Sequence, residues 1–300
     1  MHSTLMIFID GVGIGKRDFE FNPFFKYQFK MFTEIFGEIP HLNKKRISVN
    51  NAHIFPIDAI LGVPDIPLSG TGQTSIFCGV NAQKIIGRHF GPYPYSTLIP
   101  IIEQKNIFKE LLRRRKKVTF ANAYPKIFFD YVKTGRRILS VTTLSCILSN
   151  VRLNRIGDIH KGKALSADVD NYRLIYKMNY KLPLITPEKA ANRLLNIADS
   201  HHFTLFEYFY TDHLGHGRNL DLFERTINVF DNFIYHVIKN LPSNMTLIIC
   251  SDHGNFEDLS TKSHTLNPAL GITAGKYSDV LAKKIKKLYH IKPAIMELYE

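Results

Sequence analysis

The hydrophobic positions of this chain form four short apolar runs, at residues 5–9, 117–121, 203–209 and 245–250. Each run is rich in β-branched or aromatic residues and stops at a polar cluster, as strands do. Hydrophobicity without polar alternation is expected of parallel strands that are covered on both faces. The pattern therefore predicts four parallel strands inside the protein.

Amphipathic segments alternate with these runs. Residues 220–241 place apolar side chains at alternating spacings of four and three, which makes one apolar stripe on a helix. Thr186 suits the N-cap of another helix and Pro187 its first position, and residues 278–289 repeat the amphipathic pattern with a basic outer face. This alternation predicts an α/β fold with an open, mostly parallel sheet sandwiched by helices.

Residues 126–185 differ from the rest, because they are rich in basic and aromatic residues and show weaker periodicity. A structureless loop of this length is uncommon. We therefore expect a small cap at 126–185, inserted into a core formed by residues 1–125 and 186–300. Arg136 and Arg137 in this cap are candidates for closing over an anion, and a solvated surface pair is the alternative.

Length and composition set the class of protein. Three hundred residues with 45% hydrophobic content suffice for one substantial core. No run approaches the apolar length needed to cross a membrane, and the chain begins without a secretory leader pattern. Cys78, Cys146 and Cys250 are odd in number and lie in apolar contexts. We expect them to be reduced core residues of a cytoplasmic protein.

The chain is strongly basic, with a formal charge of +13. This excess favours an anionic partner, such as a phosphorylated metabolite, a nucleic acid or a membrane surface. The sequence contains neither a Gly-rich RNA-binding segment interleaved with aromatic residues nor zinc-finger spacing. We therefore favour a small phosphorylated substrate over nucleic acid.

Acidic residues and histidines follow three of the predicted strands. They lie in Asp10-Gly11, in Asp212 through His216, and in Ser251-Asp252-His253-Gly254-Asn255, with His264 further on. In open α/β sheets, ligands bind beyond the carboxyl ends of the strands. A lone Asp after a strand is also typical of a turn, but three such clusters at one edge predict a shared site. Asp and His together supply the donors of a Zn²⁺ or Mn²⁺ site.

Residues 67–75 combine glycines and hydroxyls before a segment that can form a helix. A helix N-terminus holds phosphate well, and a hydroxyl there that also binds a metal could attack phosphorus. An ordinary Ser or Thr N-cap is the alternative. The segment is not a P-loop, because the spacing and the lysine are missing.

Two further residues are candidates for binding substrate. Arg88 could bind a phosphate group bidentately, and Asn122, at the end of the predicted strand 117–121, could hydrogen-bond substrate at the same sheet edge. A surface arginine and a turn-forming asparagine are the alternatives.

The ordered set of motifs, which ends with His264-Thr265-x-Asn267-Pro268, resembles the alkaline phosphatase superfamily. It resembles in particular the branch with cofactor-independent phosphoglycerate mutase and phosphopentomutase. The resemblance implies two divalent metal ions, Mn or Zn, and a covalent phosphoenzyme. It implies one metal held by Asp212, His216 and His264, and another held by Asp10, Asp252, His253 and the nucleophile. Thr71 fits the nucleophile position best, and Thr74 is the second choice.

The leading hypothesis is therefore a two-metal phosphohydrolase that acts on a phosphate monoester or diester through a phosphothreonine. A phosphomutase acting on a sugar or glycerate phosphate is the alternative within the same fold. A non-catalytic, basic protein that binds nucleic acid or a membrane surface is the alternative from another class. The sequence does not choose the substrate, the metal or the oligomeric state.

Overall fold

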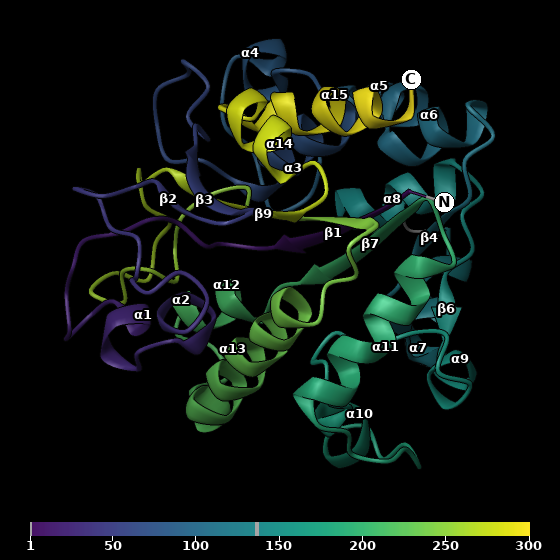
Figure 1. The fold of residues 1–300 in the computed structure, drawn as a ribbon. Coiled ribbons are helices and arrows are strands. Elements are labelled where there is room, and N and C mark those ends of the chain that lie inside the picture. The colour runs from purple at the N-terminus through teal and green to yellow at the C-terminus, as the bar shows by residue number, and fades with distance from the viewer. Residues whose placement is uncertain (1, 136–137) are drawn as a thin grey trace.

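The computed structural model describes residues 2–135 and 138–300, so Arg136 and Arg137 lie outside the described residues. A seven-stranded sheet runs through the centre of the protein, with helices on both faces (Figure 1). In order across the sheet, the strands are β2 (Ile47–Val49), β3 (Ala52–Ile57), β9 (Ala269–Gly275), β8 (Met245–Cys250), β1 (Ser3–Ile9), β7 (Phe203–Tyr208) and β4 (Val118–Phe120). A separate pair is formed by β5 (Ala123–Tyr124) and β6 (Asn154–Arg155).

Most strands of the large sheet point the same way. β4, β7, β1 and β8 run parallel to one another. β9 is antiparallel to both β8 and β3, and β2 is antiparallel to β3. Five of the seven strands, namely β4, β7, β1, β8 and β3, therefore share one direction. The expected mostly parallel α/β fold is confirmed.

The four predicted strands correspond to β1, β4, β7 and β8, but the sequence pattern did not indicate β2, β3 and β9. β9 has the sequence ALGITAG, and Gly and Ala are depleted in strands. β3 contains Pro56, which argues against a paired strand when only the sequence is considered. Tertiary pairing on both sides of these two strands outweighs their weak local preference.

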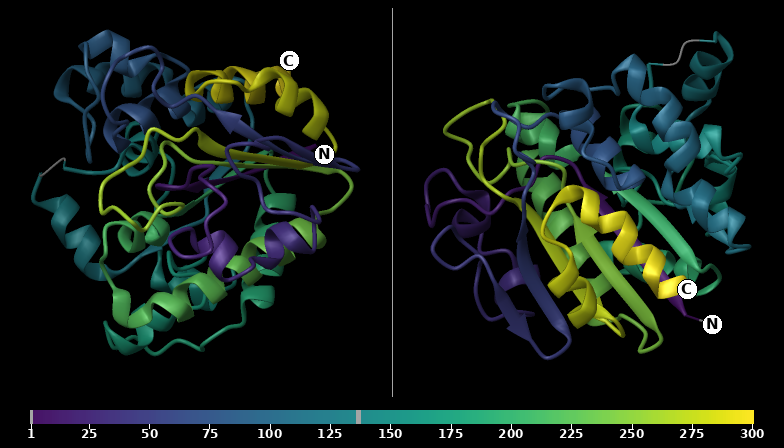
Figure 2. Two further views of the ribbon diagram at one scale, coloured as in Figure 1. Left: turned by 90° about the vertical axis from the view of Figure 1, so that its left-hand side faces the viewer. Right: turned by 90° about the horizontal axis from the view of Figure 1, so that it is seen from above.

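Helices cover both faces of the sheet, as the side chains of β1 show. Leu5, Ile7 and Ile9 point into one core, whereas Met6 and Phe8 point into the other. The first core is closed by α1 (Pro23–Lys26), α2 (Lys30–Thr33), α11 (Pro187–Asp199) and α13 (Phe223–Lys239). The second is closed by α3 (Ser69–Cys78), α5 (Ile99–Lys105), α6 (Ile107–Arg113), α8 (Val141–Leu148), α14 (Ser278–Lys284) and α15 (Ile291–Met296). Figure 2 shows α14 and α15 lying over the strands.

Shorter elements connect these layers. The remaining α-helices are α4 (Ala82–Ile86), α7 (Lys126–Lys133), α9 (Ile156–His160), α10 (Tyr172–Tyr176) and α12 (Tyr210–Gly215). The 3₁₀ turns are η1 (Ser96–Leu98), η2 (Leu220–Leu222), η3 (Leu288–His290) and η4 (Glu297–Tyr299).

Two of the three predicted helices are confirmed. Thr186 caps α11 by accepting a hydrogen bond from the Lys189 N–H at 3.2 Å, with Pro187 at the first helical position. The predicted helix 220–241 appears as η2 followed by α13. The single helix expected over 278–289 is wrong, because α14 ends at Lys284 and Ile285 is extended and fully buried.

The segment 126–185 contains α7, α8, β6, α9 and α10. α8 contributes Val141 and Leu144 to the second core. Other parts of the segment form a small separate cluster around Ile159, Ala164 and Leu174. The segment is thus partly built into the core, and the cap boundaries stay a prediction.

Two smaller expectations concern the class of protein. Among the described residues, no helix combines the length and the apolar character that crossing a bilayer requires. Cys78, Cys146 and Cys250 are free and buried, as expected of core residues. Burial raises the pKa of the Cys78 thiol to about 12, so this group stays protonated.

Candidate metal centre

The carboxyl ends of three neighbouring strands meet at one edge of the sheet. β1 lies between β7 and β8 and is parallel to both. Asp10 directly follows β1, Asp252 and His253 follow β8, and Asp212 lies in the first turn of α12, just after β7. The topology thus delivers acidic and imidazole side chains to one place, as expected for an open α/β sheet.

Asp10, Asp252 and His253 form the first group. One donor atom from each lies within 4.8 Å of the others. The Nε2 atom of His253 is 3.4 Å from Asp10 Oδ1 and 3.5 Å from Asp252 Oδ2. Asp252 and His253 are fully buried, and Asp10 is only partly exposed.

Asp212, His216 and His264 form the second group, next to His253. Donor atoms of Asp212, His253 and His264 again lie within 4.8 Å of one another. The Nε2 atom of His216 is 3.0 Å from His264 Nε2 and 3.4 Å from Asp212 Oδ2. The structure therefore brings together all six residues predicted as ligands, in two adjoining groups.

The tautomers of two histidines follow from their main-chain contacts. Nδ1 of His216 lies 2.7 Å from the carbonyl oxygen of Lys262, and Nδ1 of His264 lies 2.8 Å from that of Pro67. A carbonyl oxygen can only accept, so each Nδ1 carries the proton. Each Nε2 then keeps its lone pair and faces the cluster, which is the arrangement that metal-binding imidazoles use.

The electrostatics of the first group fit bound cations. Burial raises the pKa of Asp10 well above its usual value, and the charges of Asp252 and Asp212 add to this. Burial, together with Asp212, raises the pKa of Asp252 to about 7. Asp10 Oδ1 is also buried without a hydrogen-bond partner among the described residues. Crowded buried carboxylates of this kind are stabilised by positive ions.

The imidazole of His253 is suited to the same role. Burial lowers the pKa of His253 to about 3, and the neighbouring His264 contributes in the same direction. The ring is therefore neutral near pH 7, and neutral imidazole is the form that binds metals. The three carboxylates and three imidazoles are compatible with two divalent cations. Carboxylate and imidazole donors suit either Mn²⁺ or Zn²⁺.

Asp212 is held in its charged form. Burial alone would raise the pKa of Asp212, but in the metal-free protein the adjacent imidazoles of His216 and His264, when protonated, keep it well below its usual value. Asn255 adds to this effect, because its Nδ2 donates to Asp212 Oδ1 at 2.7 Å. Asn255 therefore orients one predicted ligand, a contribution that the sequence analysis did not assign.

Two glycines allow the loops to approach this closely. Gly11 has a φ of +69°, and a Cβ atom there would lie 2.6 Å from Asp212 Oδ1. A Cβ atom on Gly254 would lie 2.3 Å from Glu257 Oε1. The Glu257 carboxylate in turn accepts a hydrogen bond from the Asn255 N–H at 2.8 Å, which ties this loop together. A side chain at Gly11 would displace Asp212, and one at Gly254 would displace Glu257.

The structure places Ser69, rather than Thr71 or Thr74, at the cluster. α3 begins at Ser69, whose Oγ is 3.0 Å from His253 Nε2. The hydroxyls of Thr71 and Thr74 donate instead to main-chain carbonyls, at 3.1 and 2.6 Å. Each step along a helix turns the side chain by about 100°, so positions two and five residues after Ser69 point elsewhere.

A cavity of about 730 Å³ opens beside these residues, and its lining includes Asp10, Ser69 and Asp212. Arg88 does not line this cavity. It is exposed, and its guanidinium group lies over the rings of Phe90 and Tyr95. The cavity is lined by Arg173 and Arg218 instead.

Asn122 does line the cavity, but its amide bonds to the main chain. Nδ2 donates to the Glu207 carbonyl at 2.7 Å, and Oδ1 accepts from the Glu207 N–H at 2.8 Å. Asn122 thus holds β7 in place, and its role in substrate binding stays a prediction.

Two further residues at the cluster escaped the sequence analysis. Gln73 Nε2 lies 3.4 Å from Asp10 Oδ2 and 3.5 Å from Asp252 Oδ2. Glu207 is buried in β7 and accepts a hydrogen bond from the Thr142 hydroxyl at 2.8 Å. Burial raises the pKa of Glu207 to about 7, with a further contribution from Asp252. A single carboxylate inside the apolar run 203–209 was the signal for Glu207, because buried Glu is rare.

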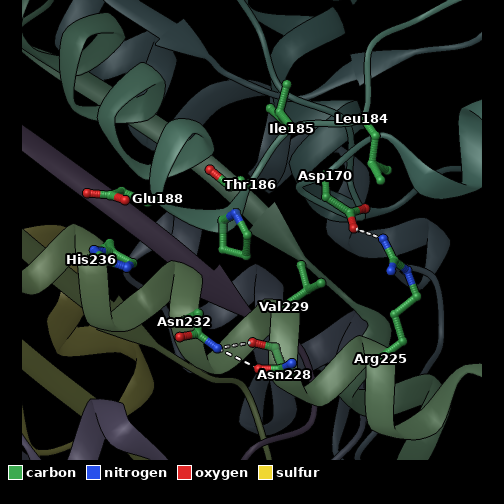
Figure 3. Close-up of a pocket in the computed structure, with 11 residues that line it drawn as sticks. Asp170, Leu184, Ile185, Thr186, Glu188, Arg225, Asn228, Val229, Asn232 and His236 are labelled. Atoms are coloured by element: carbon green, nitrogen blue, oxygen red, sulfur yellow. Dashed lines mark hydrogen bonds and ion pairs between the residues drawn. The ribbon is translucent and has the colours of Figure 1, made fainter.

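Another hollow lies apart from this edge of the sheet. It measures about 430 Å³ and lies between the start of α11 and α13 (Figure 3). Its lining includes the ion pair between Asp170 and Arg225, together with Asn228 and Asn232. None of the six clustered residues lines it. The cavity beside Ser69 is therefore the candidate site.

Sequence comparisons identify relatives of the C-terminal part. Residues 168–300 match the family model described as the Metalloenzyme superfamily. A 2,3-bisphosphoglycerate-independent phosphoglycerate mutase from Ehrlichia canis (strain Jake) is 26% identical over 128 residues, which cover 38% of this chain and 25% of the mutase. A phosphopentomutase from Helicobacter pylori (strain G27) is 35% identical over 63 residues, which cover 21% of this chain and 15% of that protein. The chain thus aligns with only a quarter or less of each curated relative.

Structural comparisons extend the similarity to nearly the whole chain. The alkaline phosphatase from the Antarctic bacterium TAB5 matches with a TM-score of 0.55 at 14% identity, covering 99% of this chain and 97% of the phosphatase. The PH0037 protein from Pyrococcus horikoshii matches with a TM-score of 0.56 at 12% identity, covering 99% of this chain and 96% of that chain. At such identities the likeness establishes the fold. The family match over residues 168–300, the fold and the ordered motifs agree, and together they support the alkaline phosphatase superfamily.

Proposed function

We propose that this protein is a two-metal phosphohydrolase that cleaves phosphate esters through a phosphoserine on Ser69. The observation that carries the proposal is the position of the Ser69 hydroxyl, 3.0 Å from His253 Nε2, in the cavity that Asp10 and Asp212 also line. Ser69 replaces the predicted Thr71 and Thr74, whose hydroxyls bond to main-chain carbonyls. The candidate nucleophile, the candidate metal ligands and a cavity for the substrate therefore lie next to one another.

The six clustered residues would hold two cations, three residues to each. Asp10, Asp252 and His253 would hold one cation and, with Ser69, form its side of the site. Asp212, His216 and His264 would hold the other. When bound, such cations make a nearby hydroxyl more acidic and neutralise the charge on the phosphate oxygens. The three clustered aspartates contribute about −3, so two divalent ions leave a net positive site for an anionic substrate.

Ser69 then carries out the transfer. Its oxygen attacks phosphorus, the bond to the alcohol oxygen breaks, and the alcohol leaves after taking up a proton. The first turn of α3 presents main-chain N–H groups and the positive end of its dipole to the transferred phosphoryl group. Water then cleaves the phosphoserine and releases inorganic phosphate. In a mutase, the phosphoryl group would instead return to another hydroxyl of the retained substrate.

Hydrolysis is supported by the whole-chain similarity to alkaline phosphatases, with 99% of this chain matched. Transfer by a mutase is the second candidate, because both curated sequence relatives are named as mutases. Those alignments cover only part of each protein, so they do not by themselves assign mutase activity to this chain. The two reactions differ in whether inorganic phosphate is released.

The test combines metal analysis, turnover and mapping of the phosphoenzyme. The purified protein is analysed for bound Mn and Zn and assayed with an aryl phosphate monoester and diester. We expect about two metals per chain and release of inorganic phosphate. Acid quenching followed by peptide mass spectrometry should then find the phosphoryl group on Ser69.

Two variants separate the candidate nucleophiles. Ser69→Ala should lower kcat by roughly 10³-fold or more while metal content stays normal. Thr71→Val should retain a phosphoenzyme, because its hydroxyl faces the main chain. Phosphate on Thr71 or Thr74 would refute the assignment of Ser69. Retention of the phosphoryl group on isomerised substrate would favour the mutase, and absence of both metal and turnover would favour the non-catalytic alternative.

A further inference from the structure

The cavity beside the candidate metal centre has aromatic side chains on its wall. Tyr124, Phe128 and Tyr131 line it together with Asp10 and Ser69. Phe128 and Tyr131 belong to α7 and are three residues apart, so they share one face of the helix. No residue of α7 is buried, although the helix carries several large apolar side chains. Its aromatic face therefore points at the cavity and does not complete a core.

Apolar side chains continue this wall. Ile138 and Met178 line the cavity, yet they are 58% and 40% exposed. Large apolar side chains left open to a cavity that also contains polar catalytic groups are typical of a ligand site. Because the same cavity reaches Ser69, the natural occupant is the organic part of the phosphate ester.

The chemistry of the wall favours a flat ring over a polyol. The rings of Tyr124 and Phe128 are stacked, with centroids 3.9 Å apart and planes 19° apart. The hydroxyl of Tyr124 is paired with Thr143 at 2.7 Å, and that of Tyr131 donates to the Ile138 carbonyl at 3.3 Å. The wall thus offers ring faces and few free hydrogen-bonding groups. An aromatic ligand would extend the existing stack.

Arg173 supplies a polar group on the lining of the same cavity. Its guanidinium group lies 4.1 Å from the ring centre of Tyr210, and Nη1 donates to Asn219. Nη2 is buried and has no hydrogen-bond partner among the described residues. This N–H group is available to an acceptor on the edge of a ring or to a second anionic oxygen.

The volume agrees with an occupant of nucleoside size. A cavity of about 730 Å³ lies within the range of sites for drug-sized ligands. A three-carbon phosphate would fill the metal end and leave the aromatic wall uncovered. We infer that the site takes a phosphate ester whose alcohol part carries a flat aromatic ring of nucleobase size. The phosphate end of this inference rests on the proposed function, whereas the ring end rests on the wall of Tyr124, Phe128 and Tyr131.

A matched pair of ligands tests the inference. Adenosine 5′-monophosphate and ribose 5-phosphate share the phosphate and the ribose and differ in the nucleobase. Their binding to the Mn²⁺-loaded Ser69→Ala protein is measured by calorimetry, with adenosine as a third ligand. We expect adenosine 5′-monophosphate to bind at least about tenfold more tightly than ribose 5-phosphate, because stacking of a base on aromatic side chains is worth such a factor.

Two variants of α7 locate the effect. Phe128→Ala should lower the affinity for adenosine and for its 5′-monophosphate about five- to tenfold and leave that for ribose 5-phosphate unchanged. Ile127→Ala is the matched control, because Ile127 is 67% exposed and does not line the cavity. It should change none of the three affinities.

The outcomes distinguish the two proposals. Adenosine binding that depends on Phe128, without any gain from the phosphate group, would keep the ring subsite and reject the metal-dependent phosphate end. Equal binding of adenosine 5′-monophosphate and ribose 5-phosphate would overturn the ring subsite while leaving hydrolysis standing. Failure of adenosine and both phosphates to bind, or equal effects of Phe128→Ala and Ile127→Ala, would also overturn it.

Discussion

Replacing Glu207 by glutamine is expected to stabilise the metal-free protein at alkaline pH. Glu207 is 6% exposed, and its carboxylate accepts a hydrogen bond from Thr142. A glutamine has nearly the same shape, and its Oε1 can accept the same bond. The substitution therefore removes a buried negative charge near Asp10 and Asp252 without opening a cavity.

The magnitude follows from the shift in pKa. Burial raises the pKa of Glu207 from an ordinary 4.5 to about 7. The folded protein then binds the proton more tightly than the unfolded chain, so stability is highest below pH 4.5 and is lost as the pH rises through 7. At 1.36 kcal/mol per pH unit, the charged group costs about 3 kcal/mol at pH 8 and only about 1 kcal/mol at pH 5.

Urea unfolding in excess EDTA measures this cost. The free energy of unfolding is determined at pH 5 and pH 8 for the wild type, for Glu207→Gln and for Glu224→Gln, which changes an exposed residue of α13. The gain from Glu207→Gln should be roughly 2 kcal/mol larger at pH 8 than at pH 5, whereas Glu224→Gln should show no such difference. The titration of His253, to which Glu207 does not contribute, is common to all three proteins and cancels in the comparison. Glu207 raises the pKa of Asp10, so the release of Asp10 in Glu207→Gln adds to the gain at pH 8. An equal gain at both pH values would refute the reasoning.

Two other predictions concern the metals. Chelation should lower the thermal midpoint of the loaded protein, because ions bound only by the folded state contribute about 4 kcal/mol per site at a free concentration of 1,000 Kd; an unchanged midpoint in EDTA would contradict the metal centre. Asn255→Ala should weaken metal binding about 10- to 100-fold in a chelator competition, because Asp212 loses a hydrogen bond that orients it. Asn240→Ala, at the exposed end of α13, should leave the affinity unchanged.

The sequence predicted the parts of the fold whose local pattern and tertiary environment agree. The apolar runs that became β1, β7 and β8 are buried along their whole length, so uninterrupted hydrophobicity was a sufficient signal. β9 carries two glycines and two alanines, and only its pairing with β8 and β3 makes it a strand. Such pairing joins residues far apart in the chain, and no local pattern reports it.

The candidate site was likewise predictable only where a local sequence pattern was sufficient. Asp10, Asp252 and His253 each lie within three residues of a predicted strand. The rule that ligands bind beyond the carboxyl ends of strands in an open α/β sheet was therefore enough to group them. The nucleophile depended on where α3 begins, and a shift of two residues turns a side chain by about 200° around the helix. The proposal of Ser69 in place of the predicted Thr71 is therefore a small shift along the chain with a large effect in space.

The predicted division between core and cap also limits what the superfamily can say about the substrate. The groups proposed to bind and transfer phosphate lie at the ends of core strands and at the start of α3. The aromatic wall comes from Tyr124, just before the predicted cap, and from α7, within the stretch where the sequence showed weak periodicity and no motif. Relatives that share the core motifs can thus share the chemistry at phosphorus while differing in the wall. The substrate preference of this chain must therefore be measured directly. The most direct measurement is the affinity of Phe128→Ala for adenosine 5′-monophosphate compared with that for ribose 5-phosphate.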